Sequence, residues 1–344
     1  MSNEQTDEHL DPIFSNLLKS HQIEIKIIPS YHCDINCEYC YNKENDCEFY
    51  HCNYNKLIGQ LDRIFQHDNI NAIVEIIGGE PLSAKTYPLT KDLITYLNNL
   101  SENIKIVLQT GSPSHEKIVN LIPSIDGLSY SIDISSSPKA KNIKHLETIS
   151  KECQQHSVIS QIQTVLSKSD KPDDILKFMK TCESHEIGWI GLGYPQYQRH
   201  SKNELDGQIE TYLQIIKFID SFLELKVGGA MIESVCDFIQ GISYNSSCMC
   251  GEKSITIQPD GTITPSLHNS LNKRYNLSEF IRLKEDRCSV LKNGICSCCQ
   301  FWNTCHGGCM AHAEFITGNV YNRDVEYCYV LSNVLRRINE SLVP

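Results

Sequence analysis

The sequence predicts an α/β protein with a parallel sheet, followed by a smaller cysteine-rich domain. Between residues 23 and 225, short apolar runs alternate six times with longer helical patterns, which implies parallel strands joined by right-handed crossovers. From residue 236 onward the helical periodicity fades, and ten of the 17 cysteines lie in the last 109 residues. We therefore expect an N-terminal extension (1–22), an α/β domain (23–235) and a C-terminal domain (236–344).

The predicted strands are short and rich in β-branched residues, as is typical of strands buried on both faces of a sheet. They are residues 23–29, 72–79, 104–110, 127–133, 158–166 and 187–193. The helices that follow have apolar residues at helical spacing, and they are residues 54–65, 89–100, 115–122, 143–156, 173–185 and 205–225. Six units make either an open doubly wound sheet or a partial barrel, because a closed eight-unit barrel needs ~250 residues. In both architectures ligands bind at the carboxyl ends of the strands.

The cysteine content is unusual for a chain of 344 residues. The first residues, MSNEQTDEHLDPIF, lack the basic and apolar regions of a signal peptide, and no apolar run approaches the ~20 residues of a membrane span. We therefore expect a cytoplasmic protein without membrane attachment, whose cysteines bind metal rather than form disulfides. The formal net charge of −11 argues against nucleic acid as a partner.

Three cysteines, Cys33, Cys37 and Cys40, follow the first predicted strand in one tight loop. Thiolates of this kind hold iron–sulfur clusters. A four-iron cluster with three protein thiolates leaves one iron open to a substrate or cofactor, as catalytic metal sites keep an open position. The alternative is a zinc site completed by Cys47 or Cys52.

The second predicted strand ends in the segment IIGGEP, residues 76–81. Gly78 and Gly79 allow the backbone to come close to a ligand, Glu80 supplies a carboxylate, and Pro81 stiffens the turn. Taken alone, the segment also fits a simple turn from strand to loop.

Together, the CxxxCxxC loop, Tyr39 just before its third cysteine, and the GGEP segment resemble the radical S-adenosylmethionine (SAM) superfamily over residues 22–225. The resemblance implies a partial (β/α)6 TIM-like barrel. It also implies a [4Fe–4S] cluster whose open iron chelates the amino and carboxylate groups of SAM. The implied cluster ligands are Cys33, Cys37 and Cys40. The implied SAM contacts are Gly78, Gly79, Glu80 and Pro81.

Weaker similarities follow the next two strands. Thr110 and Ser131 lie where the family places ribose and carboxylate contacts, and ordinary polar residues at strand ends are the alternative. Many relatives carry an arginine after the fourth strand that meets the SAM carboxylate. This sequence has no arginine from 134 to 190; the first lysines of that stretch are Lys139, Lys141, Lys144 and Lys151.

The C-terminal cysteines resemble the SPASM extension of radical SAM maturases, which binds two auxiliary [4Fe–4S] clusters. The matching positions are Cys250, Gly261, Cys296, Cys299, Cys305, Gly307, Gly308, Cys309 and Cys328. The resemblance implies that one auxiliary cluster is held by Cys296, Cys299, Cys305 and Cys328. Without the N-terminal motifs, a zinc ribbon would fit residues 296–309 as well.

The other auxiliary cluster is incomplete by comparison, because Ser266 stands where the family usually has cysteine. Cys250 and Cys309 match, and Cys248 is a third candidate. The fourth ligand is Cys288, His268 or absent. The resemblance therefore implies one catalytic cluster and one or two auxiliary clusters.

The resemblance implies a radical SAM peptide maturase. In this chemistry, one electron reductively cleaves SAM, and the resulting 5′-deoxyadenosyl radical abstracts hydrogen from a ribosomally synthesised peptide, which installs a crosslink or another modification. An electron donor such as flavodoxin or ferredoxin is also implied. No separate leader-binding domain is recognisable before the barrel, so we expect leader recognition by a second protein or by the barrel itself.

Two other functions stay open. One is modification of a protein in the manner of anaerobic sulfatase maturases, which carry an aspartate at the position of Leu267. The other is a non-catalytic iron–sulfur protein that transfers electrons. For the remaining candidates we expect local roles: Cys153 and Cys182 as buried apolar side chains, Trp302 against the cluster shell, and His306 and His312 as structural residues rather than ligands.

Overall fold

The structure is a computed structural model that describes residues 22–40, 52–66, 70–134, 138–167, 169–194, 198–222, 225–242, 250, 253–267 and 275–342. Nearly all of the predicted N-terminal extension lies outside this part of the chain. Three ligand candidates, Cys47, Cys248 and His268, also lie outside it.

The six predicted strands are confirmed, and each pairs in parallel with the next along the chain. They are β1 (Gln22–Ile27), β2 (Asn71–Ile76), β3 (Ile104–Thr110), β4 (Gly127–Ser131), β5 (Ile159–Val165) and β6 (Trp189–Gly193). The six helices are confirmed as well. They are α2 (Tyr54–Phe65), α3 (Tyr87–Leu100), α4 (His115–Leu121), α5 (Leu146–Gln155), α6 (Pro172–Ser184) and α7 (Lys202–Phe218), with short 3-10 helices at Ile122–Ser124, Pro138–His145 and Ile219–Ser221.

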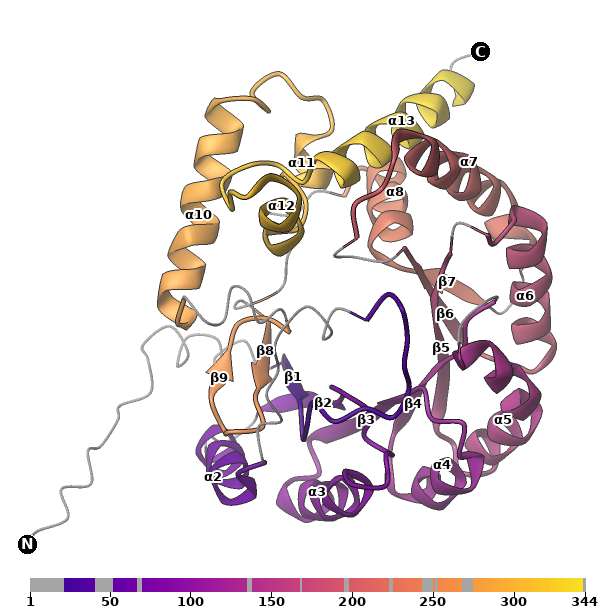
Figure 1. Ribbon diagram of the computed structural model, residues 1–344, viewed down its shortest axis with the longest axis vertical. Coiled ribbons are helices and arrows are strands. Elements are labelled where there is room, and N and C mark those ends of the chain that lie inside the picture. The colour runs from indigo at the N-terminus through magenta and orange to yellow at the C-terminus, as the bar shows by residue number, and fades with distance from the viewer. Residues whose placement is uncertain are drawn as a thin grey trace, which may run out of the picture.

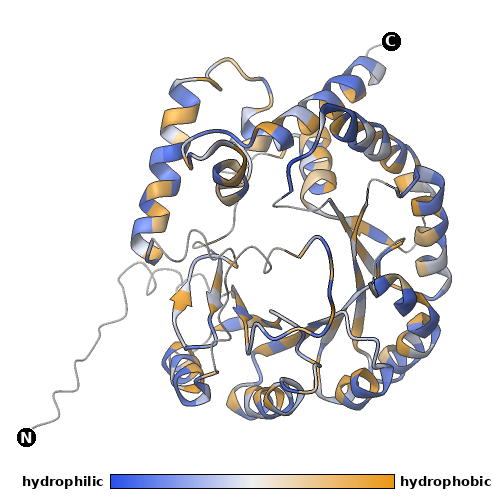
Figure 2. Cartoon of the chain, viewed as in Figure 1, coloured by the Kyte–Doolittle hydropathy of each residue, from blue (hydrophilic) through white to orange (hydrophobic). Residues whose placement is uncertain are grey.

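These units form a partial barrel: the curved sheet lies inside and α2 to α7 run around its outside (Figure 1). The helices turn apolar residues toward the sheet at helical spacing, such as Leu57, Leu61 and Ile64 of α2. Figure 2 shows the corresponding alternation of hydrophilic and hydrophobic residues around the outer helices. No helix among the described residues is long and apolar enough to cross a membrane.

The expectation that the strands are buried on both faces is wrong for most of them. Only β4 is buried along its whole length, whereas β2 and β3 alternate between buried and more exposed residues. On β1, the isoleucines pack in the core, and Lys26 on the other face pairs with Glu24 at 3.2 Å and with Glu75 of β2 at 3.7 Å. The inner face of an incomplete barrel is not filled by apolar side chains, so charged residues remain there.

The sheet is larger than predicted. Within the described residues its order is β7-β6-β5-β4-β3-β2-β1-β8-β9. The added strands are β7 (Lys226–Gly228), β8 (Ser254–Ile257) and β9 (Ile263–Thr264). β8 pairs in parallel with β1, and β9 pairs antiparallel with β8. The predicted domain boundary at residue 235 falls inside α8 (Ala230–Gln240), and β8 and β9 extend the barrel sheet from beyond it.

The expectation that helical periodicity fades after residue 236 is wrong. The C-terminal part contains α10 (Leu277–Asn293), α11 (Trp302–Cys305), α12 (Met310–Thr317) and α13 (Val325–Leu342). Asn276 begins α10 with a capping box to Glu279. α13 is joined to α7 by Tyr329, which donates to Asp206 at 2.6 Å, and by an ion pair of Arg337 with Glu210. Figure 1 shows α10 to α12 beside β8, in the sector that the barrel helices leave uncovered.

Candidate functional site

The first cysteine triplet lies in the loop that leaves the carboxyl end of β1, as predicted. The loop is compact: Cys37 N donates to Ile35 O at 3.1 Å, and Cys40 N donates to Cys37 O at 3.4 Å. Desolvation raises the pKa of Cys33 to about 11, and the charges of Glu80, Cys40 and Cys37 add to the rise. The three thiols are therefore close enough to act on one another electrostatically.

Gly78 and Gly79 lie directly beneath this loop. Gly79 N donates to Ser30 O at 3.0 Å, and Glu80 N donates to His32 O at 2.8 Å. A Cβ on Gly79 would lie 2.2 Å from His32 O, and Gly78 has a φ of 137°, which favours glycine. The two glycines thus let the end of β2 run against the segment that leads into Cys33.

The carboxylate of Glu80 is 2% exposed and already has three donors. It accepts hydrogen bonds from Thr110 Oγ1, from Gly111 N at 3.0 Å and from Leu82 N at 2.9 Å. Burial raises the pKa of this carboxyl group, while these hydrogen bonds oppose the rise. Glu80 therefore fixes the ends of β2 and β3 to each other next to the cysteine loop.

A second group of residues joins the cysteine loop to the end of β4. Tyr39 donates its hydroxyl hydrogen to Asp133, which also accepts from Val165 N at 3.2 Å. The ammonium of Lys139 lies 5.6 Å from the centre of the Tyr39 ring. Burial raises the pKa of Cys37, whereas the charge of Lys139 and the nearby Tyr39 side chain lower it. Of the four lysines noted in the sequence, Lys139 is thus the one that acts on the cysteine loop.

The predicted contacts Thr110 and Ser131 are both buried at the strand ends around this loop. Thr110 bonds Glu80, and the carbonyl oxygen of Ser131 accepts from Asn142 Nδ2 at 3.0 Å. No motif in the sequence indicated Asn142. Its Nδ2 also donates to Gly111 O at 3.0 Å, and its buried Oδ1 has no partner among the described residues. An unpaired acceptor at this edge suits a ligand that carries hydrogen-bond donors.

The second cysteine set lies after α10: Cys296 and Cys299 precede α11, Cys305 ends α11, and Cys328 lies in the first turn of α13. Cys299 N donates to Cys296 O at 3.0 Å, and Gly308 N donates to Cys305 O at 2.8 Å. Burial raises the pKa of Cys305 to about 12, and the charges of Cys328, Cys296 and Cys299 contribute. The structure therefore brings together the four cysteines predicted to share one auxiliary cluster.

The other predicted auxiliary set is only partly described. Cys250 and Cys309 both pack on the small apolar cluster around Phe280 and Met310, whereas Cys288 packs beside Cys296 and Trp302. Ser266 is buried. Cys288 thus lies on the side of the second set rather than with Cys250.

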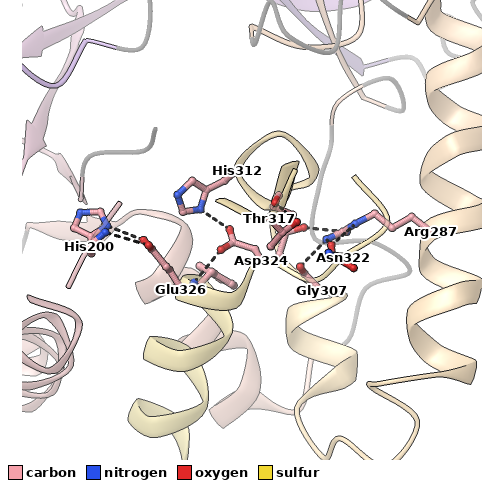
Figure 3. A network of polar contacts seen from close by, with 11 residues as sticks. His200, Arg287, Gly307, His312, Thr317, Asn322, Asp324 and Glu326 are labelled. Carbon is pink, nitrogen blue, oxygen red and sulfur yellow. Dashed lines mark hydrogen bonds and ion pairs between the residues drawn. The ribbon is translucent and has the colours of Figure 1, made fainter. Parts of the chain in front are cut away.

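The predicted local roles agree with the structure where it describes them. Cys153 and Cys182 are fully buried in the main core. Trp302 packs with Cys296, and His306 Nε2 lies 3.0 Å from Asn303 O. His312 Nδ1 lies 2.8 Å from Asp324 (Figure 3).

The cysteine sets consist of sulfur donors only, which suits iron–sulfur clusters. Among the described residues, no group of three or more His, Cys, Asp or Glu side chains is placed to hold one metal ion. The thiolates of a cubane bind separate irons, so they stand farther apart than ligands of one zinc. The sulfur-only donor sets, three at β1 and four after α10, are those of iron–sulfur clusters.

Comparisons with known proteins agree with this geometry. Residues 29–165 match the family described as a 4Fe-4S single cluster domain. No curated protein matches the sequence. The solved structure of anSMEcpe with bound AdoMet and the Cp18Cys peptide is similar over 94% of this chain and 98% of that chain, with a TM-score of 0.67 and 16% identity. SuiB from Streptococcus suis, bound to S-adenosylmethionine, is similar over 95% of this chain and 83% of its own, with a TM-score of 0.60 and 15% identity.

The chain has the fold of anSMEcpe and SuiB, both of which were solved with bound S-adenosylmethionine. The predicted partial barrel with a cysteine-rich C-terminal region is therefore confirmed. The individual ligand and SAM contacts remain predictions, for which the structure supplies positions. Most of the described candidates lie at the carboxyl ends of β1 to β4 or after α10, whereas Cys250 precedes β8 and Cys288 lies within α10.

Proposed function

We propose that the chain is a radical SAM enzyme that modifies a peptide. The observation that carries the proposal is the cysteine loop at the end of β1, held on the glycines at the end of β2 within a fold shared with SAM-bound proteins. Cys33, Cys37 and Cys40 would hold a [4Fe–4S] cluster. When bound, the cluster supplies the electron that cleaves SAM, and this gives the radical that abstracts hydrogen from the substrate.

The residues around the loop bind and orient the cofactor in this proposal. Asn142 Oδ1 is a free acceptor for a donor of SAM. Lys139 supplies the positive charge for the SAM carboxylate that an arginine supplies in many relatives, because it lies over Tyr39 and acts on Cys37. Glu80 holds the ends of β2 and β3 in place, since its carboxylate is occupied by protein donors.

The peptide substrate is proposed from two observations. The similar structure of anSMEcpe contains a bound peptide, and its likeness spans the C-terminal part of this chain too. The chain also carries the cysteine spacing of the maturase extension. A separate leader-binding protein and a flavodoxin or ferredoxin as electron donor complete the proposal.

Modification in the manner of sulfatase maturases is less well supported. In that family an aspartate stands at the position of Leu267. Leu267 packs here on Ile28, Tyr31 and Ile77, so this position offers an apolar contact and no proton acceptor.

Anaerobic reconstitution with iron and sulfide tests the proposal. With dithionite and SAM, the wild-type protein should release 5′-deoxyadenosine, and the triple variant Cys33→Ala/Cys37→Ala/Cys40→Ala should release none. A non-catalytic electron-transfer protein would bind iron and leave SAM intact. If the triple variant still cleaved SAM, the assignment of the first cluster would be wrong.

A further inference from the structure

Arg287, on the inner side of α10, is a buried cation held only by backbone oxygens. Its side chain is 2% exposed. The guanidinium donates five hydrogen bonds. They run from Nε to Asn322 O (3.3 Å), from Nη1 to His306 O (3.4 Å) and Gly308 O (3.2 Å), and from Nη2 to Gly307 O (2.7 Å) and Asn322 O (3.0 Å) (Figure 3).

This cation has no carboxylate partner in the part of the chain that the structure describes. Asp324 is the carboxylate whose charge reaches Arg287, and it is engaged by His312 Nδ1 at 2.8 Å. Carbonyl dipoles compensate a buried charge only in part, and an unpaired buried ion is costly. The fold therefore leaves room for another negative charge near Arg287.

The cysteines around Arg287 identify that negative charge. Three of the four carbonyl groups that it binds belong to the turn between Cys305 and Cys309, and Cys288 is its neighbour in the chain. The charges of Cys288, Cys309 and Cys305 all act on the guanidinium. An iron–sulfur centre with four thiolate ligands is an anion, so it is the counter-charge that the polypeptide alone does not provide.

A second arginine, Arg323, acts on the same cysteines. Arg323 is partly buried, and its Nε is buried without a hydrogen-bond partner among the described residues. Its positive charge acts on the thiols of both Cys296 and Cys328. The charges of Arg287 and Arg323 therefore both act on the four-cysteine set.

We propose that Arg287 and Arg323 are resident counter-charges of an iron–sulfur centre held by Cys296, Cys299, Cys305 and Cys328, and that they hold its reduction potential at a more positive value. The inference rests on the C-terminal centre of the proposed function. Reduction adds one negative charge to the centre, so fixed positive charges nearby stabilise the reduced state more than the oxidised state.

A potential measurement separates this role from simple fastening of the turn. The background for the experiment is the full chain with Cys33, Cys37 and Cys40 replaced by alanine, so that only C-terminal iron contributes to the signal. Arg287→Gln and Arg323→Gln remove one charge each. Arg282→Gln on the exposed side of α10 and Arg336→Gln on α13 are matched controls with the same charge change.

The protein is reconstituted anoxically and titrated with dithionite under electron paramagnetic resonance. Arg287→Gln and Arg323→Gln should each change the ratio of oxidised to reduced centre at a fixed potential about tenfold toward oxidised, which is about 59 mV for one electron. Both controls should stay within twofold of the background, and Arg287→Lys, which keeps the charge, should stay closer to the background than Arg287→Gln.

Three results would overturn the inference. If neither glutamine variant shifts the ratio beyond the controls, the arginines are not counter-charges, although SAM cleavage by the wild-type protein would stand. If the background binds no iron, the C-terminal centre itself is absent. If Arg287→Gln does not retain iron, the test rests on Arg323→Gln alone, because Arg323 donates no hydrogen bond to the turn within the described residues. An unchanged ratio of oxidised to reduced centre in Arg323→Gln would then overturn the proposal.

Discussion

The two cysteine regions of this protein are built in different ways. The triplet at the end of β1 is supported by a close backbone contact, because Gly79 brings the end of β2 against the cysteine loop. The cation near this triplet is Lys139, whose ammonium lies over the Tyr39 ring. The four-cysteine set after α10 surrounds a buried arginine that is fixed by five hydrogen bonds. A flexible lysine beside three thiols suits a site that receives a ligand. A fixed arginine beside four thiols suits a centre that only exchanges electrons.

The largest effect that distinguishes the two regions should come from Gly79→Ala. Its Cβ would lie 2.2 Å from His32 O, so the cysteine loop must move, at a cost of about 1–3 kcal/mol or more. We expect loss of the iron bound by Cys33, Cys37 and Cys40 and of SAM cleavage, with the C-terminal iron retained. Iron and sulfide analysis of the reconstituted variant measures this.

Gly59→Ala is the matched control, since a Cβ there meets no atom within 4 Å. It should keep the full iron content. Full iron content in Gly79→Ala would show that the contact of β2 with the loop does not support the first cluster.

The next effect concerns the lysine. Lys139→Met keeps the length of the side chain and removes the charge that we assign to the SAM carboxylate. A hydrogen bond to a charged group contributes about 1.5–3 kcal/mol, so SAM affinity should fall about 10- to 100-fold. Equilibrium binding of SAM to the reconstituted protein tests this, with the exposed Lys141→Met as control. Equal SAM affinity in both variants would remove Lys139 from the site and leave the cluster assignment intact.

The same contrast explains what the sequence could predict. The barrel units follow from local patterns, such as the apolar positions of α2, and the cysteine spacings are contiguous motifs. α10 was missed because its buried side includes Lys284 and Arg287, which read as surface residues and break the apolar periodicity. β8 was missed because its pairing with β1, over four residues, cannot be predicted from the sequence of a short strand alone.

The site shows the same limit. The cysteines can be recognised in the sequence by their residue type and spacing. The roles of Asn142, Asp133 and Arg287 depend instead on contacts with residues far away in the sequence. Asn142, for example, joins the carbonyl groups of Gly111 and Ser131, which lie on different strand ends. Such residues are ordinary polar side chains until the fold has placed their partners.

The smallest effect tests whether the fold around the C-terminal cysteines depends on the pair of His312 with Asp324. In Figure 3 this pair lies between the pair of His200 with Glu326 and the hydrogen bonds of Arg287. Burial lowers the pKa of His312, but the hydrogen bond and charge of Asp324 outweigh it, and the pKa lies above 6.5. A raised histidine pKa stabilises the fold fully below pH 6.5, and this contribution is lost as the pH rises through the folded value. His312→Gln should therefore lower the Tm by about 2 °C at pH 6, corresponding to about 1 kcal/mol, and by less at pH 9.

Thermal unfolding at both pH values measures the difference, with the exposed His156→Gln as control. An equal loss at the two pH values would mean that the pair acts through neutral hydrogen bonding, and the fixed positive charge beside the four cysteines would then come from the arginines alone.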